Sequence, residues 1–397
     1  MTTDAIIAQE ERFLLPTYTK MPLALERGSG VYLWDTSGTR YLDFYGGHCV
    51  ALLGHCHPRV TAAIQRQAGQ LQFYSNVSYS PVRARAAERL VSLAPEGLGH
   101  AFFANSGSEA NETALKMGRQ WTGKPGVIAM EGGFHGRTLG SLAVTASAKY
   151  RAPHAAVLPS VHFAPFGDVD AVEQLLTQHD DIGTLILEPI QSIAGMRMAP
   201  PAYYRALRAL CDTHDVVLIF DEVQTGVGRT GTFSISQQLG MKPDIITLAK
   251  SLGAGMPVSA VLVSDALAAM VEPGDQGSTF GGGMLAMAAV EATMEALVED
   301  NLMARAAHVH ERLAAGLAPH VSSIRGLGCL IGVEMPRPVK PLLAALRAEG
   351  VLAGGSGDPH VMRLMPPLVT PDEAIDACIE AFAAAAATLH QPAPAHA

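Results

Sequence analysis

The chain has 397 residues, enough for two or three domains at ~150 residues each. Its 28 basic and 37 acidic residues give a net charge of −9, and charged residues make up only 16% against 48% hydrophobic ones. An acidic chain without a basic block is a poor nucleic-acid ligand, and its apolar content excludes disorder over the whole length. No apolar run reaches the ~18 residues of a membrane span. The scarcity of charge indicates that part of the surface is covered.

The first residues and the cysteines favour a cytoplasmic protein. Residues 1–16 carry acidic side chains where a signal peptide has basic ones. The five cysteines are scattered and form no CxxC pair, which fits reduced thiols better than a disulfide framework. We therefore expect neither nucleic acid nor a membrane among the partners.

Short apolar runs alternate with helical patterns from about residue 55 to 285. In chain order the runs are AFFA (101–104), GVIAM (126–130), TLILEPI (184–190), VVLIF (216–220) and IITLAK (245–250). Helical sequences such as SEANETALKMGRQW and YYRALRALCDTH lie between them. Near-continuous Val/Ile/Leu runs separated by helices are typical of buried parallel strands. They predict an α/β fold with a mainly parallel, doubly wound sheet, in a large domain over residues 55–290.

Both ends of the chain are predicted to contribute to a smaller α+β domain. YLWDTSGTRYLDF (32–44) is typical of a β-hairpin, and residues 1–54 form the segment that joins this domain. In residues 291–390, RGLGCLIGVEM is predicted as a strand, VMRLMPPL as an edge strand ended by its prolines, and PLLAALRAEG and PDEAIDACIEAFAAAAATL as helices. Residues 391–397 are expected to be a frayed tail.

A small-residue turn, Asn105-Ser106-Gly107-Ser108, lies between a predicted strand and a predicted helix. The N–H groups and partial positive charge of a helix N-terminus bind phosphate. Gly107 allows close approach of the backbone, and the serine hydroxyls add hydrogen bonds. The alternative is a simple serine N-cap, which for an isolated motif is the commoner case.

Two ionisable residues end predicted central strands. Asp221 follows VVLIF at the sheet edge where α/β folds bind ligands, and a carboxylate buried there requires a cation, such as a protonated pyridine nitrogen. Lys250 follows IITLA and precedes a glycine-rich turn, where desolvation would make it a Schiff-base nucleophile. The alternatives are a turn-capping aspartate and an exposed strand-end lysine. One βαβ step of ~30 residues separates the two, which places both at one edge.

Gly226–Gly231 formally matches the GxGxxG of a dinucleotide site. Its first glycine should end the strand directly, but four residues intervene, so we favour a tight or mobile turn. A nicotinamide oxidoreductase is the remote alternative. A phosphate-binding helix start, a buried aspartate and a strand-end lysine are together what pyridoxal 5′-phosphate requires.

The sequence resembles the class III, fold-type-I pyridoxal-phosphate aminotransferases, most closely the acetylornithine aminotransferase group. The resemblance runs from about Pro22 to about Thr370. It rests on LGHCHPRV, NSGSEANETALKMGR, GGFHGRTLGSL, LEPIQ, LIFDEVQTGVGRTG, PDIITLAKSLGAGMP, GSTFGGGMLAMAA, RGLGCLIGVE and MRLMPPL. It implies pyridoxal 5′-phosphate as cofactor and an enzyme of amino-acid biosynthesis, such as arginine biosynthesis.

The resemblance also assigns roles. It implies that Lys250 and Asp221 are catalytic, as the cofactor-binding lysine and the partner of the pyridinium nitrogen. Further implied cofactor contacts are Ser106, Gly107, Ser108, Phe134, Glu188, Val223, Gln224 and Thr279. Thr279 would reach the phosphate of the neighbouring subunit, so the resemblance implies a homodimer with shared sites.

Substrate contacts implied by the resemblance are Arg137, Ser278 and Arg363, with Arg363 gripping the α-carboxylate and Glu188 as its gate or partner. Without the resemblance, Phe134 and the two arginines would be read as ordinary core or surface residues. No metal ligand is expected, because His55 and His57 in GHCHP have no further ligands nearby in the sequence and are interpreted as structural.

The implied reaction moves the terminal amino group of an N-acetylornithine-like acylated diamino acid to 2-oxoglutarate, giving a semialdehyde and glutamate. Aminotransferases of ornithine, GABA or a carrier-bound lysine analogue, and aminomutases, are alternatives. Two departures from the family pattern lie near the substrate side: Ser192–Gly195 replaces Gly-Glu-Gly-Gly, and Gly283-Met284 replaces Asn-Pro. They leave the amino donor open.

Overall fold

The computed structural model describes residues 1–389, and within them the main sheet has seven strands in the order β4-β12-β11-β10-β7-β5-β6. These strands are β4 (His100–Ala104), β12 (Ser259–Val263), β11 (Ile245–Leu248), β10 (Val217–Asp221), β7 (Ile182–Leu187), β5 (Gly126–Met130) and β6 (His162–Ala164). Neighbours pair in parallel except for β12, which is antiparallel to both β11 and β4. The predicted α/β sheet is confirmed, and β6 and β12 go beyond the predicted strands.

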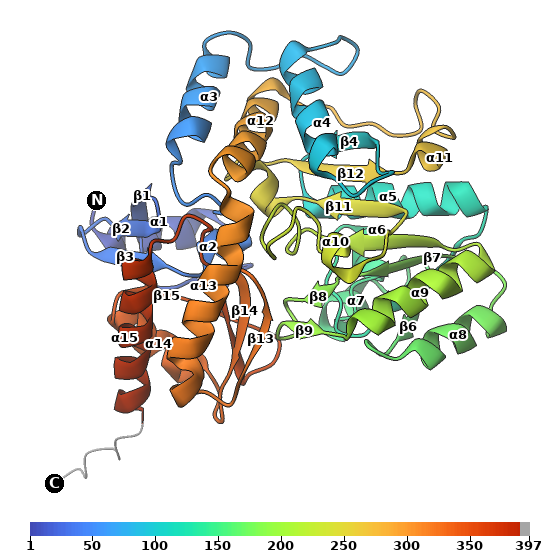
Figure 1. Ribbon diagram of the computed structural model, residues 1–397. Helices are drawn as coiled ribbons and strands as arrows, with labels where there is room; N and C mark the ends of the chain where they lie inside the picture. The colour runs from blue at the N-terminus through green and yellow to red at the C-terminus, as the bar shows by residue number, and fades with distance from the viewer. Residues whose placement is uncertain (390–397) are drawn as a thin grey trace.

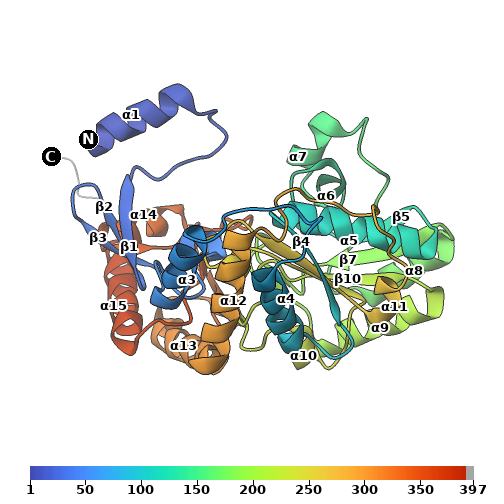
Figure 2. The same cartoon turned by 90° about the horizontal axis from the view of Figure 1, so that it is seen from above.

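Alternate residues of the central strands enter two separate apolar cores. In β10, Leu218 and Phe220 belong to one cluster, and Val217 and Ile219 to the other. Helix α5 (Gly107–Thr122) covers one face of the sheet and α9 (Pro201–His214) the other (Figure 2). Both faces are therefore buried, which is why the strands are apolar throughout rather than alternating with polar residues.

Two further four-stranded sheets lie beside the main one (Figure 1). The first has the order β1-β2-β3-β15, with β1 (Leu25–Ser29), β2 (Tyr32–Asp35), β3 (Arg40–Asp43) and β15 (Val351–Leu352). The second has the order β13-β14-β17-β16, with β13 (Ser323–Leu327), β14 (Leu330–Glu334), β17 (Val361–Leu364) and β16 (Gly354–Gly355). The predicted hairpin is confirmed as β2 and β3.

Two predictions about these strands are wrong. RGLGCLIGVEM forms the hairpin β13-β14 rather than one strand, because the chain reverses at Gly328. VMRLMPPL does not lie at an edge, since β17 pairs with β14 on one side and β16 on the other. The prolines Pro366 and Pro367 follow the end of β17, so they remove no hydrogen bond from the ladder.

Strand β15 pairs in parallel with β3, so residues near 351 complete the sheet of the N-terminal hairpin. We therefore propose the domain division expected from sequence, with residues 1–54 and 291–390 forming the small domain and 55–290 the large one. The expected frayed tail, 391–397, lies outside the described residues.

The helices connect and cover these sheets (Figure 1). Besides α5 and α9 they are α1 (Thr3–Phe13), α2 (Gly46–Cys49), α3 (Pro58–Ala68), α4 (Pro81–Leu93), α6 (Leu139–Ala143), α7 (Ala148–Arg151), α8 (Val169–Gln178), α10 (Ser236–Leu239), α11 (Asp265–Ala268), α12 (Met284–Glu299), α13 (Leu302–Leu317), α14 (Lys340–Ala348) and α15 (Asp372–Thr388). The two helices predicted near the C-terminus are confirmed as α14 and α15. None of the helices within residues 1–389 is long and apolar enough to cross a membrane.

Candidate active site

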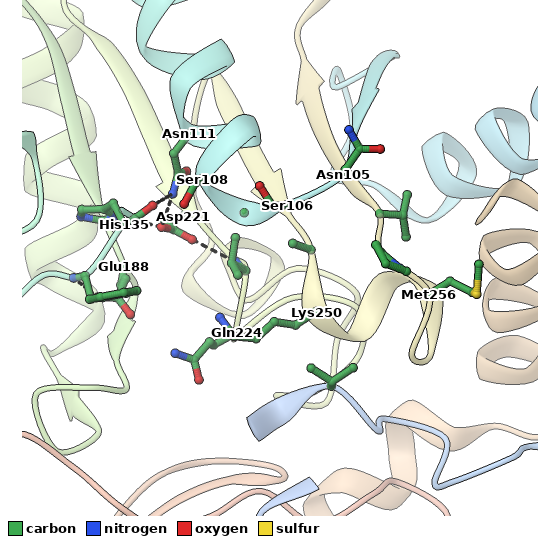
Figure 3. A pocket seen from close by; sticks show the side chains of 18 of the residues that line it. Asn105, Ser106, Ser108, Asn111, His135, Glu188, Asp221, Gln224, Lys250 and Met256 are labelled. Carbon is green, nitrogen blue, oxygen red and sulfur yellow. Dashed lines mark hydrogen bonds and ion pairs between the residues drawn. The ribbon is translucent and has the colours of Figure 1, made fainter. Parts of the chain in front are cut away.

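A cavity of about 380 Å³ opens at the carboxyl ends of the central strands (Figure 3). This volume is in the range of small-molecule sites. Nine residues predicted from the sequence line it: Ser106, Gly107, Ser108, Phe134, Glu188, Asp221, Val223, Gln224 and Lys250. The fold thus brings residues from the segments 106–108, 134, 188, 221–224 and 250 to one place.

Asp221 ends β10 and is only 4% exposed. Its Oδ2 atom accepts a hydrogen bond from Asn111 Nδ2 at 2.8 Å and lies 2.8 Å from Nδ1 of His135. Its Oδ1 atom accepts the backbone N–H of Val223 at 3.1 Å. Figure 3 shows these contacts around the carboxylate. They fix its orientation at the cavity wall.

Lys250 follows β11 and begins a short 3₁₀ turn, η2 (Lys250–Gly253). Its φ of 41° lies in the left-handed region, which costs a non-glycine residue ~1–3 kcal/mol and is found mainly at functional sites. Burial lowers the pKa of its amine, while Cys49 and Asp221 oppose that effect. In the described part of the chain, the amine has no hydrogen-bonded or ion-paired partner. Such an amine is suited to covalent attachment of a carbonyl compound.

The predicted helix start is confirmed, since α5 begins at Gly107 with Ser106 as N-cap. The Ser106 hydroxyl accepts the Glu109 N–H at 3.3 Å, so the serine also performs the capping role weighed as its alternative. A Cβ on Gly107 would lie 3.1 Å from both methyl carbons of Val223. Because glycine leaves this space free, a ligand can approach the N–H groups of the first turn.

Further lining residues can hold a flat ring. Phe134 and Val223 both line the cavity, and the Phe134 N–H donates to Glu188 Oε1 at 2.8 Å. Burial raises the pKa of Glu188 to about 7, and the nearby Asp221 charge adds to the rise. The buried Oε1 atom of Gln224 has no partner among the described residues, which leaves it free to accept a hydrogen bond from a ligand.

The predicted substrate arginines lie outside the cavity lining. Arg363 in β17 is buried; its Nε donates to Gly355 O at 2.7 Å and its Nη1 to Ser192 Oγ at 3.1 Å. Burial lowers the pKa of its guanidinium, and the Glu188 charge opposes this. No salt bridge joins Arg363 to Glu188 within residues 1–389. Arg137 is exposed, with its guanidinium 3.3 Å from the ring centre of Tyr150.

Ser278 and Thr279 lie on a loop that contacts Asn105, a residue of the cavity lining. The Ser278 hydroxyl accepts hydrogen bonds from Asn105 Nδ2 at 3.1 Å and from Gly281 N at 3.0 Å. Thr279 is exposed and does not line the cavity of its own chain.

Four residues not predicted from the sequence also belong to the neighbourhood of this site. Asn111 and His135 hold Asp221, as described above. Tyr45 contacts the imidazole of His48 through its hydroxyl and lies with its ring centre 5.8 Å from the Arg363 guanidinium. Burial lowers the pKa of His48 to about 4, with Arg363 and Lys250 adding to the effect. The available sequence signals were weak: Asn111 is one helical turn beyond Gly107, and His135 follows Phe134.

Two sequence alternatives are resolved by local structure. Residues 226–230 form turns, and no helix starts at Gly231, so the segment lacks the strand–turn–helix arrangement of a dinucleotide site. Its Arg229 is instead fully buried and donates to the carbonyls of Met365 and Pro366. In GHCHP, Nε2 of His55 lies 2.8 Å from a carboxylate oxygen of Asp43, which fits the structural interpretation.

Comparisons with known proteins agree with this geometry. The family model of aminotransferase class-III matches residues 14–386. The chain is 39% identical to the acetylornithine aminotransferase of Methanothermobacter thermautotrophicus, over 96% of this chain and 98% of that one, and 40% identical to that of Methanopyrus kandleri, over 94% and 96%. Among solved structures, the ornithine aminotransferase of Toxoplasma gondii superposes with a TM-score of 0.93 at 29% identity, covering 98% of this chain and 96% of that one. The acetylornithine aminotransferase of Elizabethkingia anophelis gives 0.86 at 28%, covering 98% and 100%.

The chain belongs to the class III aminotransferases. It is a pyridoxal-phosphate-dependent transaminase, and its substrates are a small-molecule amino donor and an oxo acid. The cavity fits this cofactor, because it combines a free amine, a buried carboxylate, a helix start with a glycine cradle and an unpartnered amide oxygen.

Proposed function

We propose that the enzyme moves the terminal amino group of an N-acetylornithine-like acylated diamino acid to 2-oxoglutarate, giving a semialdehyde and glutamate, in the cytoplasm. The observation that best supports transamination is that Lys250, Asp221 and the start of α5 line one cavity. The similarity to acetylornithine aminotransferases over nearly the whole chain supports the donor class. Ornithine is the second candidate donor, because ornithine aminotransferases are among the similar structures.

Each cavity residue has a task in this proposal. Pyridoxal 5′-phosphate, when bound, supplies a conjugated ring that takes up the electron pair released at the donor carbon. Lys250 binds the cofactor covalently and, once freed, moves the proton between carbons as a general base and acid. Asp221 holds a proton on the ring nitrogen. Helix α5 binds the phosphate through Ser106, Gly107 and Ser108.

The remaining wall residues orient the ring. Phe134 and Val223, which line the cavity, would hold the ring, and the unpartnered oxygen of Gln224 would accept a hydrogen bond from it. Glu188 adjoins both the ring and Arg363. Burial raises the pKa of Glu188 to about 7, which is close to the pH of the medium. The charge of Glu188 can therefore change when a substrate carboxylate binds to the neighbouring Arg363.

Substrate carboxylates are assigned to the arginines. Arg363 is buried, and it uses only part of its five N–H groups to donate to Gly355 and Ser192. Its remaining N–H groups leave a bidentate contact with the α-carboxylate open. Arg137 is exposed above Tyr150 and is positioned to turn toward the second carboxylate of 2-oxoglutarate. Ser278, which is hydrogen-bonded to Asn105 of the cavity lining, would contact the donor chain.

A homodimer with shared sites is supported by exposed apolar residues around the Thr279 loop. Phe73, Tyr74, Tyr79 and Phe280 are all more than a third exposed, and the rings of Phe73 and Phe280 lie 5.0 Å apart. Helix α1 has no buried residue, and its side-chain hydrogen bonds reach only nearby parts of the chain, such as Thr3 to Thr36 at 2.9 Å and Glu10 to Lys20 (Figure 2). An isolated helix of this length is marginal in water, so a second copy that covers it would explain its presence. In such a dimer Thr279 reaches the partner's phosphate site.

A panel of amino donors tests the proposal. The holoenzyme is supplied with 2-oxoglutarate and either N-acetylornithine, ornithine or GABA, and glutamate is measured over many turnovers. We expect the highest kcat/KM for N-acetylornithine. A clear preference for ornithine or GABA would reassign the donor, and the absence of glutamate with every terminal amine would overturn the transaminase assignment itself.

A further inference from the structure

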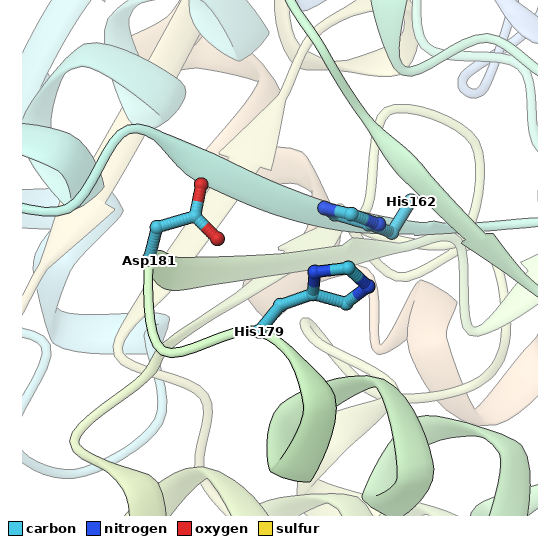
Figure 4. Close-up of side chains that lie close together, drawn as sticks. All are labelled: His162, His179 and Asp181. Carbon is cyan, nitrogen blue, oxygen red and sulfur yellow. The ribbon is translucent and has the colours of Figure 1, made fainter.

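Two histidines and an aspartate come together at the amino edge of the main sheet, away from the cavity (Figure 4). His162 is the first residue of β6, His179 is the C-cap of α8, and Asp181 immediately precedes β7. The active site lies at the opposite, carboxyl edge, where Asp221 ends β10. Because β6, β7 and β10 run in the same direction, the cluster and the active site are at opposite ends of the sheet.

The donor atoms of the cluster are already close to one another. One ligand atom from each of the three residues lies within 4.8 Å of the other two. The imidazole rings of His162 and His179 have centroids 4.1 Å apart and are tilted by 35°. Figure 4 shows the rings one above the other, with the Asp181 carboxylate on their side. Ligands at ~2.0–2.1 Å from one metal ion stand about 3.4 Å apart in a tetrahedron, so a small side-chain rotation suffices.

None of the three side chains is committed elsewhere. Within residues 1–389 their nitrogen and carboxylate atoms make no hydrogen bond to another residue. The ring nitrogens of both histidines are therefore available to a ligand. The positions themselves are firmly held, since His162 pairs with Ile128 in the sheet and the Asp181 carbonyl accepts the Gly126 N–H at 2.9 Å.

The local electrostatics favour a cation. His179 caps the C-terminus of the ten-residue helix α8, where the helix dipole is negative. Asp181 adds a carboxylate, and Asp180 beside it is exposed.

We propose that His162, His179 and Asp181 form a binding site for one divalent transition-metal ion per chain, with Zn²⁺ as the best-matched ion. Two imidazoles and one carboxylate are ligands typical of zinc, and the exposed side leaves the fourth position to water. The ion would join the edge strand β6 to the turn between α8 and β7, and it takes no part in transamination.

Calorimetric titration of the untagged holoenzyme with Zn²⁺ tests the site. The His162→Ala and His179→Ala variants are compared with His154→Ala, which removes an exposed histidine on the turn Ala152–His154 outside the cluster. We expect the wild type and His154→Ala to bind one more Zn²⁺ ion per chain than either cluster variant. We expect Asp181→Asn to bind this ion about tenfold more weakly or worse, since loss of an outer partner alone costs that much.

Thermal unfolding provides the second measurement. Zn²⁺ that binds the folded state raises the melting temperature of the wild type, and this increment should be smaller in Asp181→Asn, a variant of nearly unchanged shape. Transaminase activity, measured on each variant, checks that the protein is folded and should be unchanged. Equal Zn²⁺ stoichiometry and equal melting increments in the wild type and the cluster variants would overturn the proposal.

Discussion

Nδ1 of His135 lies 2.8 Å from Oδ2 of Asp221, and both side chains are buried. Asn111 donates to the same oxygen and also to the His135 carbonyl, at 2.7 Å. The carboxylate that we assign to the cofactor ring is thus held by two side chains from different segments. Oriented partners of this kind keep a charged group in one geometry and strengthen its interaction with a ligand.

Removing these contacts should weaken catalysis in steps. Asp221→Asn can no longer balance a positive charge on the ring nitrogen, and we expect kcat to fall by ~10²- to 10³-fold. His135→Ala removes one hydrogen bond to a charged group, and we expect a fall of about 10- to 100-fold with KM unchanged. Steady-state kinetics measures both, and the melting temperature separates positioning from unfolding. A His135→Ala enzyme with wild-type kcat would show that this contact is only structural.

In the proposed function, the whole reaction depends on Lys250. Lys250→Ala should lose multiple turnover by about 10³-fold or more, because both the attachment point and the general base are removed. Lys242→Ala, at an exposed lysine, is the matched control and should remain active. Glutamate production is the readout. Full activity of Lys250→Ala over many turnovers would refute the assignment.

The two arginines should differ in the size of their effect. Arg363→Lys keeps the charge but loses the planar fork, and we expect KM for both carboxylate substrates to rise by about 10- to 100-fold. Arg137→Ala, at an exposed position, should raise mainly the KM for 2-oxoglutarate, and by less. Initial rates with each substrate varied in turn measure this. Equal KM values in the wild type and Arg363→Lys would remove Arg363 from the substrate site.

A mixing experiment tests whether sites are shared between subunits. Lys250→Ala and Thr279→Asp are each expected to be inactive, the second because a carboxylate repels the phosphate. If Thr279 serves the partner's site, a mixed dimer contains one site with both native residues and regains about half the wild-type activity per dimer. If Thr279 serves its own chain, no mixed site is complete and mixing restores nothing.

Glu222 gives a prediction about pH. It is 1% exposed and accepts hydrogen bonds from Ile235 N at 2.9 Å and Thr225 Oγ1 at 3.2 Å, yet burial raises its pKa from 4.5 to about 7. A carboxyl group whose pKa is higher in the folded than in the unfolded state stabilises the folded state fully only below the pKa of the unfolded state. This stabilisation is lost as the pH rises through about 7.

The measurement compares wild type with Glu222→Gln, which carries no charge at any pH. Between about pH 5 and about pH 8, the unfolding free energy of the wild type should fall by up to about 3 kcal/mol relative to the variant. Shifts of other groups are common to both proteins and cancel in the difference. A difference that stays constant over this range would contradict the raised pKa.

The sequence by itself determined the features that neighbours along the chain control. Alternating apolar runs and helices specify the buried parallel strands, and the turn at Ser106–Ser108 specifies a helix start, because strand burial, N-capping and glycine turns depend on adjacent residues. The strand-end positions of Asp221 and Lys250 follow from the same patterns. Each of these features is encoded locally in the sequence, and the family motifs indicate their roles.

Only the tertiary structure decided which distant residues meet. Asp221 meets His135 and Asn111 across 86 and 110 residues, and Arg363 meets Ser192 across 171. Strand β17 lies inside its sheet only because the two-residue strand β16 pairs with its free side. His162 and His179 become neighbours because one sits at the start of β6 and the other at the end of α8. Such contacts depend on how crossovers and strand order pack the chain, and no local pattern encodes which of many histidines or hydroxyls will lie within hydrogen-bonding distance.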